Sequence, residues 1–146
     1  MKKIAIAMLA GWTLIQAQAG ELQWLTDLPK AQAKAKAENK MVILDFTGSD
    51  WCVWCTRLKN EVFSQAAFAE YASKNLVLVE VDFPHNKKMS NEQKAANDAL
   101  QKQYKVEGYP TIIVLNSEGK QVGELGYMKG GPAAFIAELD KAKQKH

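Results

Sequence analysis

Cysteine is scarce in this chain of 146 residues, which contains only Cys52 and Cys55. A framework of structural disulfides needs more cysteines, so no such framework competes for this pair. Two thiols also leave a tetrahedral zinc ion short of ligands, and His85 lies far from them in the sequence. The scarcity therefore argues against a metal site and directs attention to the pair itself.

Several other patterns are missing. No nucleotide-binding motif is present, and the Lys129-Gly130-Gly131 stretch lacks the spacing of a phosphate-binding loop. No Ser-His-Asp set and no paired-carboxylate site can be placed from the sequence. Met89 and Met128 are isolated, so no methionine-rich stretch offers soft ligands to copper(I). The sequence accordingly predicts neither a cofactor nor a resident metal.

The N-terminal residues have the three parts of a secretory signal peptide. Met1-Lys2-Lys3 is positively charged, residues 4–15 are apolar, and residues 16–20 end in small side chains. The apolar stretch is shorter than the ~20 residues that a membrane-spanning helix requires. We therefore expect cleavage after Ala19 and a periplasmic or secreted protein.

Composition bounds what remains after cleavage. The chain is 47% hydrophobic and 24% charged, which is typical of a globular protein. The formal net charge of +3 becomes +1 (3 minus 2) when Lys2 and Lys3 leave with the signal peptide, and this gives no reason to expect nucleic-acid binding. Residues 20–146 are expected to form one domain, by default a monomer, in an oxidising compartment.

The two cysteines lie in Trp51-Cys52-Val53-Trp54-Cys55, with the spacing of a redox motif. An apolar run at 42–46 predicts a strand, residues 47–50 a turn, and the residues beyond a helix. Cys52 would then lie at a helix N-terminus, where the helix dipole favours the reactive thiolate. Cys55, one turn on, would resolve a mixed disulfide. A static local disulfide is the simpler alternative, although so short a loop constrains the unfolded chain little.

The remaining pattern predicts an α/β fold. Residues 21–28 suit either a short strand or a helix start. Helices are expected at 30–40, 65–74, from the Ser90 capping box to about 104, and from Pro132 onward, and strands at 76–81, 111–115 and 121–125. Strands separated by helices predict parallel pairing, and the closing hairpin adds an antiparallel edge to a central mixed sheet flanked by helices.

Across nearly all of residues 20–146 the chain resembles the thioredoxin-fold family. The matching motifs are Leu44-Asp45-Phe46, the cysteine motif and Gly108-Tyr109-Pro110-Thr111. Within the family it is similar to exported bacterial thioredoxin-like proteins and to the C-terminal domain of transmembrane thiol:disulfide interchange proteins.

The resemblance implies roles for particular residues. Cys52 would attack and Cys55 would resolve, Pro110 would be a cis proline, and the Tyr109 backbone would meet an extended substrate. Trp51 would flank Cys52. Apart from the resemblance, the position of Trp54 between the cysteines suggests that its ring hinders access or stacks on a partner.

The resemblance also gives Asp45 a role, as the buried carboxyl that takes the proton of Cys55. One extra residue separates it from the first cysteine, so an acid facing solvent is the alternative. The lysine that accompanies this acid in thioredoxin is missing. Glu80 is the nearest ionisable residue on that strand and receives no role.

The function expected is a thiol–disulfide oxidoreductase that reduces protein disulfides. Val53 and Trp54 provide no charge that would stabilise a thiolate, so the potential should be reducing. Such a protein in an oxidising compartment would need a membrane electron donor. The alternative is a thioredoxin-fold binding module, either a chaperone or a copper(I) metallochaperone whose thiols are the ligands.

Overall fold

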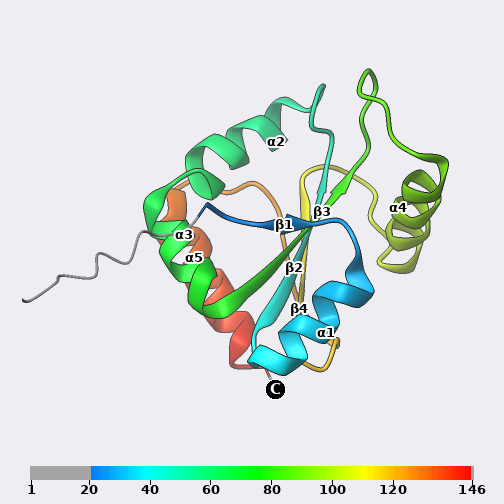
Figure 1. Cartoon of the computed structure of the whole chain (residues 1–146). Coiled ribbons are helices and arrows are strands. Elements are labelled where there is room, and N and C mark those ends of the chain that lie inside the picture. Colours follow the sequence, from blue (N-terminus) through cyan, green and yellow to red (C-terminus); the bar gives the residue numbers. More distant parts are fainter. Residues whose placement is uncertain (1–20, 146) are drawn as a thin grey trace, which may run out of the picture.

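The computed structural model describes residues 21–145, and Figure 1 shows a central sheet with helices on both faces. The predicted signal peptide, 1–19, and its cleavage site lie outside the described residues. In chain order the elements are β1 (Trp24–Leu25), α1 (Leu28–Glu38), β2 (Met41–Thr47), α2 (Val53–Leu58), a π-helical segment η1 (Lys59–Phe63), α3 (Ala66–Asn75), β3 (Leu76–Asp82), α4 (Asn91–Gln103), β4 (Thr111–Leu115), β5 (Gln121–Leu125) and α5 (Gly131–Lys143). The α/β prediction is confirmed, and the open choice at 21–28 resolves to strand β1 followed by the start of α1.

The five strands are ordered β1-β3-β2-β4-β5. β3 is parallel to both β1 and β2, whereas β4 is antiparallel to β2 and to β5. The expectation that helix-separated strands would all be parallel is therefore wrong for β4. Thr111 at its start pairs with Phe46 near the end of β2, so the chain re-enters the sheet at the edge from which β3 leaves it. The connection through α4 does not carry the chain back across the sheet.

Side-chain alternation on the two central strands divides the core into two layers. Odd-numbered positions of β2 face α3, α5 and η1, and the even-numbered ones face α1. Both layers are closely packed, with Ile43 and Leu44 fully buried on opposite faces. In the layer that faces α3, α5 and η1, the apolar side chains of β2 end at Ile43. Asp45 and Thr47 follow it on the same face, toward the C-terminal end of the strand. Polar side chains thus enter this layer only beneath the cysteine motif.

The helix boundaries follow from local capping. The Asp27 carboxylate accepts the Lys30 N–H, and Pro29 occupies the first turn of α1. Ser90 Oγ accepts the Gln93 N–H at the start of α4, as the capping-box pattern predicts. The Gln93 side chain instead donates to the Thr26 carbonyl and to Asn97. These caps fix the start of α1 directly after β1 and the start of α4 after the loop that follows β3.

The helix carrying the cysteines continues from α2 through η1 to Phe63. Its predicted apolar face is confirmed, since Leu58, Val62 and Phe63 are buried. The π-helical widening was not predicted, and it leaves the Ser64 N–H bonded to the Lys59 carbonyl, five residues back. Among residues 21–145, no helix is both long enough and apolar enough to cross a membrane.

Phe135 on α5 anchors the first core layer. It is fully buried and meets the rings of Phe63 and Phe68 edge-on at centroid distances of 5.6 and 6.1 Å. Phe135→Ala should lower the free energy of unfolding by about 3–5 kcal/mol, because it leaves a cavity that these rings cannot fill. Urea denaturation of the oxidised protein measures this. Val53→Ala, at an exposed position, is the control and should change stability by less than about 0.5 kcal/mol. Equal losses in the two variants would contradict this description of the core.

Candidate active site

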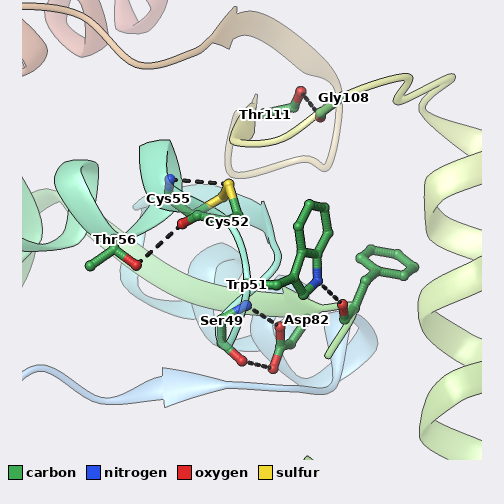
Figure 2. The surroundings of a disulfide bond; sticks show 9 residues. Ser49, Trp51, Cys52, Cys55, Thr56, Asp82, Gly108 and Thr111 are labelled. Atoms are coloured by element: carbon green, nitrogen blue, oxygen red, sulfur yellow. Dashed lines mark hydrogen bonds between the residues drawn. A yellow bond between two sulfur atoms is a disulfide. The ribbon is translucent and has the colours of Figure 1, made fainter. Parts of the chain in front are cut away.

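Cys52 and Cys55 form a disulfide where β2 hands over to α2 (Figure 2). Their Cα atoms are 5.3 Å apart. Cys52 is the N-cap residue of α2, and its Sγ accepts the Cys55 N–H at 3.2 Å. Cys52 and Cys55 are 7% and 6% exposed. A hydrogen-bond donor and a helix N-terminus both favour negative charge on the first sulfur, so the site suits a thiolate at Cys52.

Two aspartates fix the segment before the pair. Asp82, at the end of β3, accepts hydrogen bonds from the Ser49 N–H and hydroxyl (Figure 2). The Asp50 carboxylate accepts the backbone N–H groups of residues 85–87 at 2.8–2.9 Å. These hydrogen bonds, the one from His85 first, lower the pKa of Asp50. Sequence reasoning missed this clamp, because an aspartate in a turn does not reveal which distant loop it will bind.

Trp51 lies between the disulfide and this loop. Its indole N–H donates to the Phe83 carbonyl at 2.8 Å, and its ring stacks on His85 with centroids 4.5 Å apart and planes 5° apart. Tyr109 meets it edge-on at 5.7 Å. Gly48 leaves the space that the ring uses, since a Cβ there would overlap the indole. The ring is 41% exposed, so it is held in place and still open to a partner.

Trp54 belongs to a different cluster, on the side facing the loop before α5. Its ring packs against Tyr127 at 4.9 Å, and the Arg57 guanidinium lies 5.1 Å from the Trp54 centroid and 5.2 Å from that of Tyr127. Glu61 accepts hydrogen bonds from Tyr127 and Arg57, which lower the pKa of that carboxyl. Trp54 remains 50% exposed. The cluster places a cation near the motif, which the residues between the cysteines did not indicate.

Pro110 and Tyr109 lie at the same edge of the sheet as the cysteines. The Tyr109–Pro110 peptide bond is cis. Pro110 immediately precedes Thr111, whose partner Phe46 is near the end of β2. The Tyr109 hydroxyl accepts a hydrogen bond from the Gln101 amide of α4 at 2.7 Å. The structure thus brings the two separate motifs of the sequence to one edge.

Asp45 lines the pocket beneath α2 and is partly buried, which favours the buried acid over the alternative of an acid facing solvent. Its Oδ1 is buried and has no hydrogen-bond partner within the described part of the chain. Asp45 and Cys55 line the same pocket of about 510 Å³. Burial, followed by the nearby charges of Glu80 and Asp82, raises the pKa of Asp45 from 3.8 to about 8. The carboxyl is therefore mostly protonated at neutral pH.

Glu80 lies beside Asp45 in the parallel register of β2 and β3 and lines the same pocket. Burial and Asp82 raise its pKa as well, against opposing effects of Lys87 and Lys59. No paired carboxylates were predicted from the sequence, because Asp45 and Glu80 become neighbours only through the register of β2 and β3. Within residues 21–145, no group of three or more potential ligands is positioned to hold a metal ion.

The thioredoxin-like domain family matches residues 28–143, so the chain belongs to this family and the predicted resemblance is confirmed. It is 37% identical over 124 residues to the disulfide bond reductase DsbH of Chlamydia pneumoniae, covering 85% of this chain and 74% of that protein. The solved structure of a DsbH oxidoreductase superimposes with a TM-score of 0.81 at 35% identity, covering 94% of this chain and 96% of the other. The thiol:disulfide interchange protein DsbD of Klebsiella pneumoniae subsp. pneumoniae is 36% identical over 111 residues, which is 74% of this chain but only 17% of DsbD.

The raised pKa of Asp45 predicts a pH-dependent stability. Between about pH 4 and pH 8 the native carboxyl keeps a proton that the unfolded chain has lost, so this group makes the protein less stable as pH rises through that window. Asp45→Asn removes the effect. The variant should be more stable than the wild type by on the order of 3–5 kcal/mol near pH 8, and the difference should fade toward about pH 4.

Urea denaturation at a series of pH values measures this difference. Asp98→Asn is the matched control, because Asp98 is an exposed aspartate paired with Lys94 on α4 and should change stability little at any pH. If the curves for Asp45→Asn and the wild type run parallel, Asp45 titrates normally and is not the buried acid described here.

Proposed function

We propose that this protein is an exported thiol–disulfide oxidoreductase that reduces disulfides in other proteins. The observation that carries the proposal is the Cys52 sulfur at the N-cap of α2, accepting the Cys55 N–H across a two-residue spacing. The relationship to DsbH, named a disulfide bond reductase, supports this direction of electron flow. A redox pair without any other cysteine nearby can exchange with a partner and with nothing in its own chain.

The reaction follows from the positions of the two sulfurs. The Cys52 thiolate attacks one sulfur of a substrate disulfide, and the other substrate sulfur leaves as a thiolate that takes a proton from water. Cys55 then gives its proton to Asp45 in the minority of molecules whose Asp45 is ionised at neutral pH, and attacks Cys52, which releases the second substrate thiolate. The protein is left with the Cys52–Cys55 disulfide, and two electrons have passed to the substrate. Asp45 lines the pocket that Cys55 also lines, which supports its role as proton acceptor.

Four residues around the disulfide are proposed to contact the substrate. Trp51 and Trp54 present half-exposed rings on opposite flanks of the motif. Tyr109 and Trp51 also wall a second pocket of about 500 Å³, lined further by Phe83, His85 and Met89. Pro110 has no N–H, so an extended substrate would pair with the Tyr109 backbone. Aromatic rings supply large contact area at low entropic cost, as is typical of recognition surfaces.

Export and electron supply complete the proposal. Residues 1–19 act as a cleaved signal peptide, and residues 20–146 work as a monomer outside the cytoplasm. Electrons come from a membrane dithiol donor that reduces the Cys52–Cys55 disulfide. The similarity to DsbD, named a thiol:disulfide interchange protein, supports this class of partner. No nucleic acid takes part.

Single substitutions in the pair should separate the two chemical steps. Cys52→Ser should abolish reduction of a disulfide substrate such as insulin, since no attacking thiolate remains. Cys55→Ser should instead accumulate a mixed disulfide through Cys52, because nothing resolves it. Non-reducing mass analysis detects the adduct. The chaperone alternative would be favoured by two results together. The wild type would show no reductase activity, and the variant with both cysteines replaced by serine would still suppress aggregation of a client protein.

The reduction potential of the pair should lie between about −270 mV and −180 mV, toward thioredoxin and away from strongly oxidising relatives. Val53 and Trp54 carry no charge that would stabilise the reduced form through the thiolate. Titration against glutathione and dithiothreitol, followed by tryptophan fluorescence, measures the value. A potential near −120 mV would mean that the protein oxidises its clients, and the proposed direction would be wrong.

A further inference from the structure

The acidic side chains beneath α2 differ in how many hydrogen bonds they accept. Asp45, Glu80 and Asp82 lie on the same face of β2 and β3, because alternate residues of a strand share a face and Asp45 is directly opposite Glu80. Asp82 is fully engaged by the Ser49 N–H and hydroxyl. Asp45 has a buried oxygen without a partner in residues 21–145. Of the three acids, Asp45 and Glu80 are therefore the two whose charges are not fixed by hydrogen bonds described in the structure.

The charged groups around these two carboxyls are few. Lys59 of η1 and Glu21 of the N-terminal segment line the same pocket, as does the disulfide-bonded Cys55. The charge of Asp82 acts on both carboxyls, and Lys87 of the loop after β3 acts on Glu80. No ion pair joins Lys59 or Lys87 to either carboxyl within the described residues. Two neighbouring carboxyls that lack a cation in contact cannot both ionise easily, and such groups titrate as a pair.

We propose that Asp45 and Glu80 hold one proton between them, and that Glu80 is a positioning residue that keeps this proton on Asp45, next to Cys55. The proposal rests on the proposed oxidoreductase function and goes beyond it by naming what sets the protonation of the proton carrier. Glu80 is half-buried and Asp45 is the deeper of the two, so the pair loses its first proton from the group nearer to water. The charge left on Glu80 then resists ionisation of Asp45.

This arrangement matters most when the oxidised protein is reduced. The thiolate of an incoming dithiol attacks Cys52, the Cys52–Cys55 bond breaks, and the electron pair leaves on Cys55. Asp45 gives its proton to the Cys55 sulfur and becomes a carboxylate, which later takes a proton from water. The second thiol of the donor then loses its proton to water, attacks the mixed disulfide and frees Cys52. A protonated Asp45 is required only in the step that releases Cys55. Burial and the charge of Asp82 already raise the pKa of Asp45, and the Glu80 charge extends further upward the pH range in which that step is fast.

The test is a carboxyl titration of the oxidised protein by ¹³C NMR, in the wild type and in Glu80→Gln. In the wild type, both carboxyl signals should show two coupled steps. In Glu80→Gln, Asp45 should titrate in a single step at a pH lower by about one unit, because the neighbouring charge is gone. Glu124→Gln is the matched control, since it removes an equal charge from an exposed position on β5 and should leave Asp45 unchanged.

Kinetics provide a second readout that a purely structural role would not move. The rate constant for reduction of the disulfide by dithiothreitol is divided by the thiolate fraction of dithiothreitol, to remove the reagent's own pH dependence. The corrected rate constant should fall as pH rises through the pKa of Asp45. Glu80→Gln should move this fall to lower pH by the same amount, about one unit, which near neutral pH is up to about a tenfold loss of rate. Adding Glu80→Gln to Asp45→Asn should have no further effect on the profile, because Glu80 acts through Asp45.

The outcomes are distinct. An Asp45 titration that moves no more in Glu80→Gln than in Glu124→Gln overturns the proposal, as does independent single-step titration of the two carboxyls. The NMR experiment needs no substrate. Failure of the wild type to reduce any protein disulfide would therefore overturn the proposed function while leaving the carboxyl pair intact. Reductase activity without a coupled titration of Asp45 and Glu80 would overturn the carboxyl pair and leave the proposed function intact.

Discussion

The parallel pairing of β2 with β3 is the constraint on which the site depends. The register runs from Met41 opposite Leu76 to Thr47 opposite Asp82, so both strands end at the same edge. The cysteine motif follows one strand, and the loop that holds Trp51 follows the other. Because side chains alternate, the same register places Asp45 beside Glu80 under α2. If β3 slipped by one residue against β2, Glu80 and Asp82 would turn to the opposite, apolar face of the sheet. The hydrogen bonds of Asp82 to Ser49 and of Asp50 to the backbone of residues 85–87 would then be lost.

Much of the fold could be predicted from local patterns, because each element carries its own signal. The apolar runs of β2 and β3, the caps of α1 and α4, and the hairpin of β4 and β5 all lie within short stretches of sequence. The direction of β4 could not, since the length of α4 does not say at which edge the chain returns. Likewise, Cys52 and Cys55 were predicted from their spacing, whereas the Asp50 clamp, the His85 stack and the Glu80 partnership join segments about 35 residues apart and need the register to become visible.

The two flanks of the disulfide are electrostatically unlike. Beneath α2 the environment is acidic, and burial of Asp45 keeps a proton available. On the outer side, Arg57 lies over two aromatic rings, with its charge shared by Glu61. The first sulfur caps a helix N-terminus, whereas Cys55 lines the same pocket as the Asp45 carboxyl. This asymmetry distinguishes an attacking sulfur from a leaving one, although the two residues are chemically identical.

Cys52 and Cys55 are nearly buried, whereas the rings of Trp51 and Trp54 beside them are exposed, and this difference limits unspecific thiol–disulfide exchange. A cell contains many thiols and disulfides that could exchange with this pair at random. Cys52 is only 7% exposed and is overlooked by rings that are 41% and 50% exposed, so a bulky or folded reactant meets indole before it meets sulfur. The two exposed indoles therefore favour exchange with partners whose shape brings a sulfur past them to Cys52.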